Sequence, residues 1–131
     1  MGRVNQVLFF SPFNPGDFEQ AADAMERFSQ LHFLQINDAL PGRSTAGIGR
    51  LTPLRTLCAQ NIAVTDEDLA PLANLKNLEY LELDGTQLTD KSLVHLRGLK
   101  RLRTLNLYNA NQVTPQAMAE LRAGLPALDR P

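Results

Sequence analysis

Cysteine and histidine are the first residues to consider for chemistry, because a thiol activated by an imidazole base is a common enzyme nucleophile. The chain has one cysteine, Cys58, and two histidines, His32 and His95. His32 and Cys58 fall on neighbouring expected strands, and their three-residue offset alone separates them by about 10 Å. His95 falls on an expected helix on the opposite side of the molecule. We therefore expect no catalytic dyad and an ordinary Cys58 thiol, with a pKa near the unperturbed value of about 8.5.

The carboxylates and glycines give no pattern of catalysis either. Asp66 and Asp90 recur at the expected starts of two helices, where the positive end of the helix dipole favours a carboxylate. The segment Gly42-Arg-Ser-Thr lacks the lysine of a phosphate-binding loop. One dispersed cysteine and two histidines make no zinc site. We therefore expect a protein that is not an enzyme and has no metal or cofactor.

Charge and composition argue against two classes of partner. The net charge of −1 over 131 residues gives no electrostatic case for nucleic acid. The densest basic run, Arg97 to Arg103, surrounds an expected turn and is interpreted as a solvated corner. No apolar stretch approaches the length of a membrane span. A single cysteine forbids an internal disulfide and fits a reducing compartment, so we expect a cytoplasmic protein.

A 24-residue repeat defines the elements that must position any site. The pair Leu-x-x-Leu occurs three times at this interval, as Leu54 and Leu57, Leu78 and Leu81, and Leu102 and Leu105. The phase extends further, because Val64, Thr65, Asp66, Leu69, Leu72 and Leu75 return as Leu88, Thr89, Asp90, Leu93, Leu96 and Leu99. Such a period indicates a solenoid, in which each unit buries its apolar face against its neighbours.

The segment Leu78-Glu-Tyr-Leu81-Glu-Leu83-Asp-Gly-Thr86 resembles the leucine-rich repeat. The length of 24 residues is similar to that of bacterial members of this family, and also to the repeats of F-box ubiquitin-ligase receptors. The resemblance implies a strand on the concave side and a helix on the convex side of each unit. The fold class is then an α/β leucine-rich repeat solenoid, a right-handed β-α superhelix with a parallel concave sheet and about five repeats.

Local patterns agree with this architecture. Alternating apolar residues from Leu78 to Leu83 predict a strand with one buried face. Leucines at 93, 96 and 99 suit one face of a short helix that Thr89-Asp90 would open. Thr65 and Asp68 approximate a capping box, and Thr114-Pro115 predicts another helix start.

We divide the chain into a single domain, residues 1–131, with five units. Residues 1–30 are a degenerate N-terminal capping unit with a helix from Asp17 to Gln30, whose inward residues are Phe18, Ala21, Ala22, Met25 and Phe28. Residues 31–53, 54–77 and 78–101 are repeats, and in the first of them Pro41 to Gly49 reads as a Gly-rich turn in place of a helix. Residues 102–131 are a C-terminal repeat and cap, which stops at Leu125 to Leu128 where a sixth strand would begin.

The outward strand positions of successive units should line up in columns on the concave face. Four of the eight aromatic residues (six Phe and two Tyr) fall in these columns, namely Phe10, Phe33, Tyr80 and Tyr108. Aromatic residues among small polar groups are typical of protein-binding hot spots, although strand propensity alone also favours them. The predicted protein-binding residues are Phe33, Asp38, Tyr80, Glu82, Asp84 and Tyr108. They suit a partner that presents Lys or Arg beside an apolar side chain.

The sequence therefore predicts a protein-interaction module that binds a protein or peptide partner on its concave sheet. One alternative is a structural or assembly subunit that docks or self-associates through the solenoid ends, which would make it a homo-oligomer. Another is an inhibitor of a partner enzyme. We expect neither nucleic acid nor a membrane as a partner.

Overall fold

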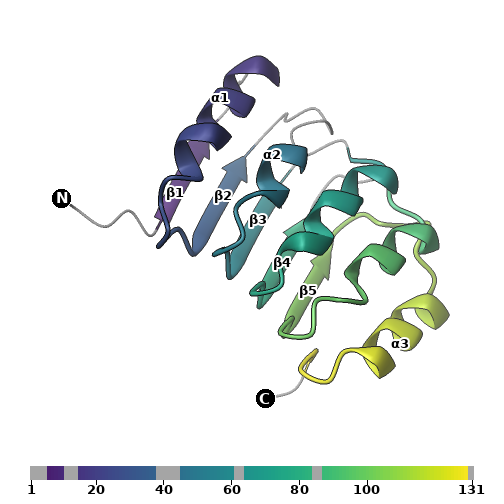
Figure 1. The fold of residues 1–131 in the computed structure, drawn as a ribbon. Coiled ribbons are helices and arrows are strands. Elements are labelled where there is room, and N and C mark those ends of the chain that lie inside the picture. The colour runs from purple at the N-terminus through teal and green to yellow at the C-terminus, as the bar shows by residue number, and fades with distance from the viewer. Residues whose placement is uncertain (1–5, 11–14, 38–44, 61–63, 84–86, 130–131) are drawn as a thin grey trace.

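Five parallel strands form one sheet in sequence order (Figure 1). The computed structural model describes residues 6–10, 15–37, 45–60, 64–83 and 87–129. The strands are β1 (Gln6–Phe10), β2 (Phe33–Asn37), β3 (Thr56–Gln60), β4 (Tyr80–Leu83) and β5 (Thr104–Leu107). The helices are α1 (Pro15–Met25), α2 (Thr45–Gly49), η2 (Glu67–Asn74), η3 (Asp90–Leu96) and α3 (Pro115–Gly124). All of these helices cover the same face of the sheet, so the predicted solenoid with a parallel concave sheet is confirmed.

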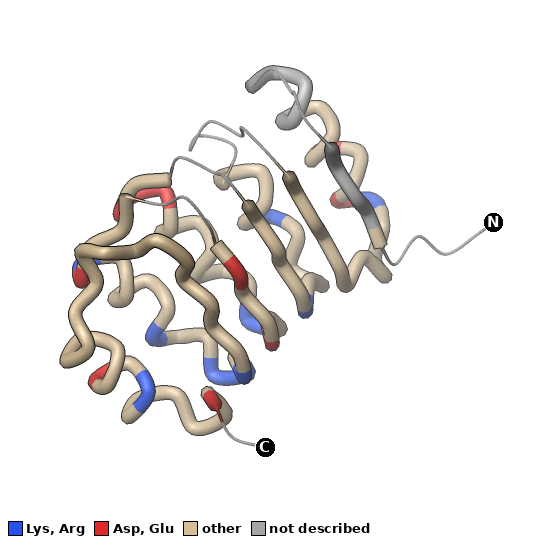
Figure 2. Tube along the Cα trace, turned by 180° about the vertical axis from the view of Figure 1, so that it is seen from behind, with Lys and Arg blue, Asp and Glu red and all other residues tan. Residues whose placement is uncertain are grey.

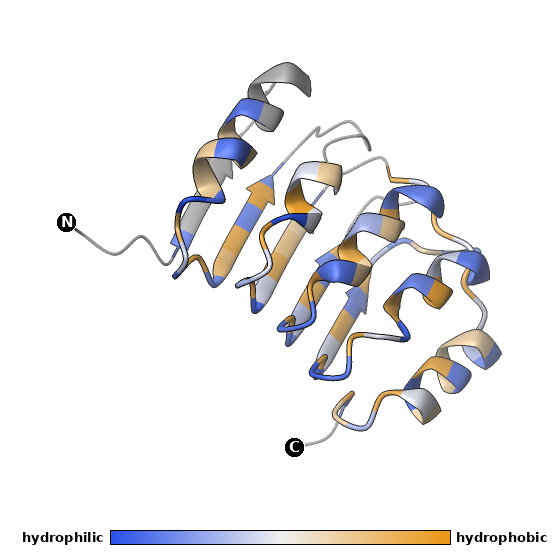
Figure 3. Cartoon of the chain, viewed as in Figure 1, coloured by the Kyte–Doolittle hydropathy of each residue, from blue (hydrophilic) through white to orange (hydrophobic). Residues whose placement is uncertain are grey.

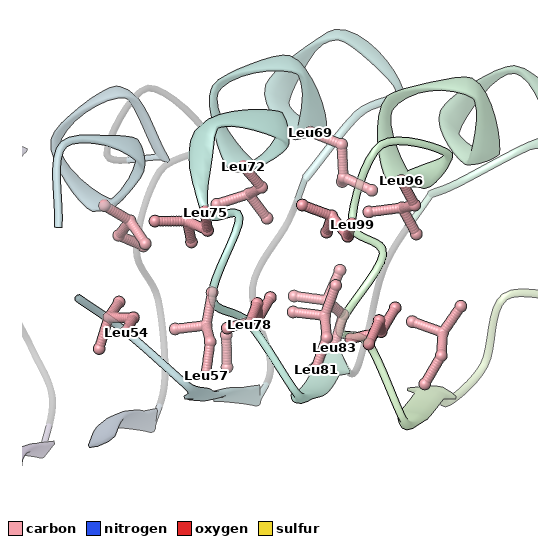
Figure 4. Packing of buried hydrophobic residues seen from close by; sticks show 14 of the residues in the cluster. Leu54, Leu57, Leu69, Leu72, Leu75, Leu78, Leu81, Leu83, Leu96 and Leu99 are labelled. Atoms are coloured by element: carbon pink, nitrogen blue, oxygen red, sulfur yellow. The ribbon is translucent and has the colours of Figure 1, made fainter. Parts of the chain in front are cut away.

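The strand register reproduces the period of the sequence. Leu57 pairs with Leu81 and Leu81 pairs with Leu105, each 24 residues further on. Phe33 pairs with Thr56, so the preceding interval is 23 residues. Because the register is constant, each buried leucine lies beside its counterpart in the next unit, and the leucines of strands and helices fill the space between them (Figures 3 and 4).

The two central helices are 3₁₀ helices rather than α-helices. A 3₁₀ helix has three residues per turn, so side chains at i, i+3 and i+6 lie along one line. Leu93 and Leu96 belong to η3 and Leu99 follows it, and all three are buried. The spacing of three thus predicted a helix correctly, and the 3₁₀ form explains why that spacing repeats without a shift to four.

An aspartate at the start of each 3₁₀ helix joins one unit to the next. Asp66 accepts two hydrogen bonds from Thr89, one from its backbone N–H at 2.8 Å and one from its hydroxyl. Asp90 accepts the same pair from Thr114, at 2.7 and 2.9 Å. The threonine hydroxyls also accept backbone N–H groups of their own helices. The helix dipole is therefore not the whole reason for the recurrence of Asp, because the carboxylates also bind the following unit.

Asp66 shows the electrostatic effect of this contact. Partial burial by itself would raise the pKa of the Asp66 carboxyl. The hydroxyl and backbone N–H of Thr89 donate to the charged form, and Lys91 and His95 add positive charge nearby. These interactions outweigh the burial, so the pKa of Asp66 is lowered from its ordinary value.

The expected Gly-rich turn of the second unit contains a helix, because α2 spans Thr45–Gly49. Residues 41–44 of that expected turn lie outside the described part of the chain. A Cβ atom on Gly49 would lie 2.5 Å from the carbonyl oxygen of Pro71 in η2, and 2.8 Å from the Cβ of Pro71. Gly49 is thus required by the close packing of two helices, and interpreting it as a turn residue was wrong.

The first helix is shorter than the predicted span from Asp17 to Gln30, since α1 ends at Met25. Ala22 and Met25 are buried as expected, whereas Phe28 is 38% exposed. Successive turns carry the chain into β2, with Phe28 N–H bonded to the Met25 carbonyl and Leu31 N–H bonded to the Phe28 carbonyl. These turns carry the Phe28 side chain out of the apolar interior that it was expected to join.

The C-terminal segment continues the stacking. Thr114 caps α3 and Pro115 occupies its first turn, as predicted. Leu125 and Leu128 are buried, and the Asp129 N–H donates to the Arg103 carbonyl at 2.8 Å. The same bond joins Arg103 to Glu79 one unit earlier. The chain thus begins to pair along β5 where a sixth strand was expected to start.

We predict that Gly49→Ala destabilises the protein by about 1–3 kcal/mol, because the added methyl group overlaps the Pro71 backbone. Gly124→Ala is the matched control, since a Cβ there meets nothing within 4 Å. Urea unfolding followed by circular dichroism gives both values. Equal stabilities of the two variants would contradict the proposed close contact.

We further predict that Asp66→Asn lowers the free energy of unfolding at pH 7 by about 1 kcal/mol, because the amide keeps only one acceptor oxygen for Thr89. The folded-state pKa of Asp66 is lowered, so its contribution is present above the unfolded pKa and disappears as the pH falls through the folded pKa. The stability difference between the wild type and Asp66→Asn should therefore vanish in acid. A difference that is constant from neutral pH into acid would show that the charge of Asp66 is irrelevant.

Candidate functional site

The strands present a nearly uncharged surface with one carboxylate. The sequences of β1 to β5 are QVLFF, FLQIN, TLCAQ, YLEL and TLNL. Glu82 in β4 is the one acidic residue in these five strands, and they contain no Lys, Arg or His. Alternation along each strand directs the leucines inward and places Glu82 with the outward polar side chains.

Three neutral side chains from three strands hold the Glu82 carboxylate and its neighbours in place. The Gln60 amide donates to one carboxylate oxygen at 2.9 Å, and the Tyr80 hydroxyl donates to the other at 2.7 Å. The Asn106 amide donates to the Tyr80 hydroxyl oxygen at 3.1 Å. We call these four residues the Glu82 network. It crosses β3, β4 and β5, and it fixes the carboxylate in one orientation on the concave face.

The hydrogen bonds of the network also set its charge. The bonds from Gln60 and Tyr80 lower the pKa of the Glu82 carboxyl from its ordinary value, against the opposing effect of partial burial. The bond to Glu82 is the main reason that the pKa of the Tyr80 hydroxyl is raised. At neutral pH the carboxylate is therefore ionised and the phenol is protonated. The site thus carries a fixed negative charge.

Cys58 lies beside this charge, because it pairs with Glu82 in the strand register. Burial raises the pKa of the Cys58 thiol, and the negative charge of Glu82 raises it further. The expectation of an unperturbed thiol pKa was wrong. Cys58 also pairs with Gln35 on β2, which leaves His32 three residues away along that strand. Both findings disfavour a reactive thiolate at Cys58.

The predicted binding residues are distributed over several strands. Phe33 and Tyr80 share one register position through Thr56, so they lie two strands apart, or roughly 10 Å. Tyr108 directly follows β5, and it is 50% exposed although its backbone N–H still bonds to the Leu83 carbonyl. Asp38 and Asp84 lie outside the described residues, as does the side chain of Phe10. The described candidates are therefore Phe33, Tyr80, Glu82 and Tyr108.

Sequence reasoning missed Gln60 and Asn106, because it selected aromatic and acidic residues. Both residues stand in the same outward columns as the predicted ones, since Asn106 pairs with Glu82. An amide beside a carboxylate in neighbouring columns was the signal that could have revealed the network. The sequence also gave Tyr80 the role of a free aromatic anchor, whereas its hydroxyl is bonded to two side chains.

The opposite face has a separate groove of about 760 Å³ between η3 and α3. Val94 lines this groove and is 50% exposed, and acidic and basic side chains are mixed around it. Among the described residues no group of three or more His, Cys, Asp or Glu could hold a metal ion. Within the same residues, no helix has the length and apolar character needed to cross a bilayer.

Solved structures that are similar to this chain include two internalins of Listeria monocytogenes. Internalin C2 is 28% identical, with a TM-score of 0.52 over 79% of this chain and 43% of its own. Internalin F is 24% identical, with a TM-score of 0.46 over 79% of this chain and 36% of its own. This chain thus spans less than half of the length of either structure. No protein-family model matches the sequence, and comparison with curated proteins gives no match.

The chain is a leucine-rich repeat protein, as its period, register and likeness to internalin C2 show together. The expected similarity to F-box receptors is not confirmed by these matches.

We predict that Tyr80→Phe raises the pKa of Glu82, because the change removes a hydroxyl that donates to the charged carboxylate. A carbon-detected NMR titration of the glutamate carboxyl groups measures this pKa directly. Tyr108→Phe is the control, because it removes a hydroxyl outside the Glu82 network and should leave the titration of Glu82 unchanged. An unshifted Glu82 in Tyr80→Phe would mean that the bond does not form in solution.

Proposed function

We propose that the protein is a non-enzymatic interaction module whose concave sheet binds an extended segment of a partner protein. The observation that carries this proposal is the ionised carboxylate of Glu82, which is the one acidic residue within the five described strands and is bonded to neutral donors. A Lys or Arg side chain of the partner would pair with it. The polar columns around Glu82 would accept the partner's backbone groups.

The geometry of the carboxylate supports a cationic partner group. An ionised carboxylate has about four acceptor positions, and Gln60 and Tyr80 occupy two of them. Among the described residues, no Lys, Arg or His forms an ion pair with Glu82. An incoming ammonium or guanidinium would therefore find a charge already oriented and not yet neutralised. Such charge-assisted hydrogen bonds are about twice as strong as neutral ones.

The exposed Tyr108 and the half-buried Phe33 would contact the apolar part of the same segment. Tyr108 projects beyond the end of β5 and Phe33 lies two strands from Tyr80, so aromatic surface flanks the Glu82 network on two sides. Tyrosine is enriched among residues that dominate binding energies at interfaces. Asp38 and Asp84 remain predicted members of this surface.

Support for a function other than catalysis comes from the chemistry of the face. The thiol of Cys58 is shifted toward its protonated form, and it lacks a histidine within reach on the neighbouring strand. We further propose, from composition, that the protein binds neither nucleic acid nor a membrane and that it is cytoplasmic. Inhibition of a partner enzyme would be one use of the same binding surface.

A second candidate is assembly through the C-terminal end of the solenoid. Leu107 is only partly buried, whereas its register partner Leu83 is 2% exposed. Leu105 is 8% exposed, compared with 0% for Leu81. The last unit therefore leaves apolar surface that a further unit or a second copy would cover. Light scattering at two protein concentrations separates this candidate from concave binding, because only end docking makes the measured mass depend on concentration.

We predict that Tyr108→Ala weakens partner binding by about thirtyfold, the effect of losing a true anchor. Val94→Ala is the matched control, because Val94 is equally exposed at 50% but lies on the groove of the convex side. Glu82→Gln should weaken binding by at least about tenfold, since it removes the charge and preserves the shape. The measurement is titration calorimetry with the partner isolated by affinity capture. Loss of binding in Val94→Ala, with full binding by Tyr108→Ala and Glu82→Gln, would refute binding on the concave face.

A further inference from the structure

We infer that a second surface, the edge of the solenoid where the chain enters its strands, binds an acidic segment of a protein. Six of the thirteen Lys and Arg residues lie at these turns in the last three units. They are Arg55, Lys76, Arg97, Lys100, Arg101 and Arg103, and we call them the basic rim. This surface is separate from the Glu82 network, and the inference does not depend on the function proposed for the concave face.

Basic residues predominate at this edge of the solenoid, although Glu79 also lies there. All six side chains of the basic rim belong to exposed residues. The opposite edge, where strands lead into helices, carries Asp66, Glu67, Asp68 and Asp90. In Figure 2 most of the blue segments of the last units lie along the lower edge, where red segments also occur, and further red segments lie at the helix starts. A partner of negative charge is therefore attracted to one edge and repelled by the other.

Within the described part of the chain, the rim cations form no ion pair. The ion pairs of the described residues join Arg50 to Asp23 and Glu26, and Arg122 to Asp129. None of these involves the basic rim. Two rim residues are instead oriented by uncharged groups, because Arg101 donates to the Asn77 side chain at 2.9 Å and Lys100 donates to the Gly124 carbonyl at 2.8 Å. Their remaining donors stay available to a ligand.

A recess in the rim has the size and lining for a carboxylate side chain. It has a volume of about 290 Å³ and is lined by Lys100, Arg101, Arg103, Glu79 and Ala127. Three cationic residues and one carboxylate therefore share this lining. A guanidinium pair suits bidentate contact with a carboxylate of the ligand, and the adjacent lysine adds a point charge.

An acidic protein segment fits the rim better than a nucleic acid does. A long polyanion would extend beyond the rim to the acidic residues of the other edge, and the whole chain is already negative at −1. Glu79 inside the recess would repel closely spaced phosphates. A short segment with a few Asp or Glu residues needs only the rim, and its carboxylates can avoid Glu79.

The test uses a short fluorescein-labelled peptide in which a few glutamates are separated by glycine and serine as the probe, and binding is followed by fluorescence anisotropy at pH 7. Wild-type protein should bind it at low ionic strength and lose most of the affinity at about 200 mM salt. The double variant Arg101→Glu with Arg103→Glu should bind about tenfold more weakly, because two exposed attractions become repulsions.

The matched control is Arg27→Glu with Lys91→Glu, which changes the net charge equally at two exposed positions outside the six rim residues, Arg27 in the turn before β2 and Lys91 in η3. Its loss of affinity should stay below about threefold. Arg101→Gln with Arg103→Gln gives the intermediate case, and it serves as the test variant if the charge reversal lowers the melting temperature. Equal losses in the rim and control variants would overturn the inference. Tighter binding of an oligothymidine or of phosphatidylserine vesicles than of the peptide would overturn it as well.

Discussion

Each unit of this protein buries its leucines between its own strand and helix and against the neighbouring units, and the rest of the structure depends on this stacking. The condition is satisfied when the strand register stays constant, so Leu57, Leu81 and Leu105 must stand side by side. Hydrogen bonds at the helix starts fix the same register from the other side, because each aspartate reaches the threonine one unit further on. Apolar stacking and these polar contacts therefore require the same strand register. A unit of different length must differ in its loops.

This constraint explains how much of the fold the sequence could predict. Buried positions recur in phase, so the leucine spacing indicated a solenoid, and the resemblance to leucine-rich repeats implied the parallel sheet with the helices on one side. The role of Gly49 could not be predicted in this way. Glycine is needed there because Pro71 lies too close for a Cβ atom, and Pro71 is distant in sequence and near only in the folded chain. The prediction that Phe28 is buried was wrong for a related reason, since consecutive turns rather than a continuous helix follow Met25.

The sequence predicted which strand positions face outward at the candidate site, but not the hydrogen bonds between their side chains. Columns on the concave face follow from the register, and this is why Phe33, Tyr80 and Glu82 were placed on one surface. The hydrogen bonds among Gln60, Glu82, Tyr80 and Asn106 depend on side-chain rotamers in three strands, which no local pattern encodes. The raised pKa of Cys58 has the same origin, because it comes from partial burial and from a charge on the adjacent strand. Neighbours across the sheet therefore decide the chemistry of this face.

The positions that differ between units are the ones to which function should be assigned. Along the sheet, the register position of Leu81 holds leucine in every unit from β2 to β5. The register position of Leu83 faces the same interior. The position between Leu81 and Leu83 faces outward, and from β2 to β5 it holds Gln35, Cys58, Glu82 and Asn106. Because the stacked interior supplies the stability, these outward residues are free to differ without loss of the fold. A single carboxylate in such a column is thus not imposed by the architecture, and neither is the concentration of cations at one edge. Both are properties of this particular chain, and the two binding surfaces proposed above rest on them.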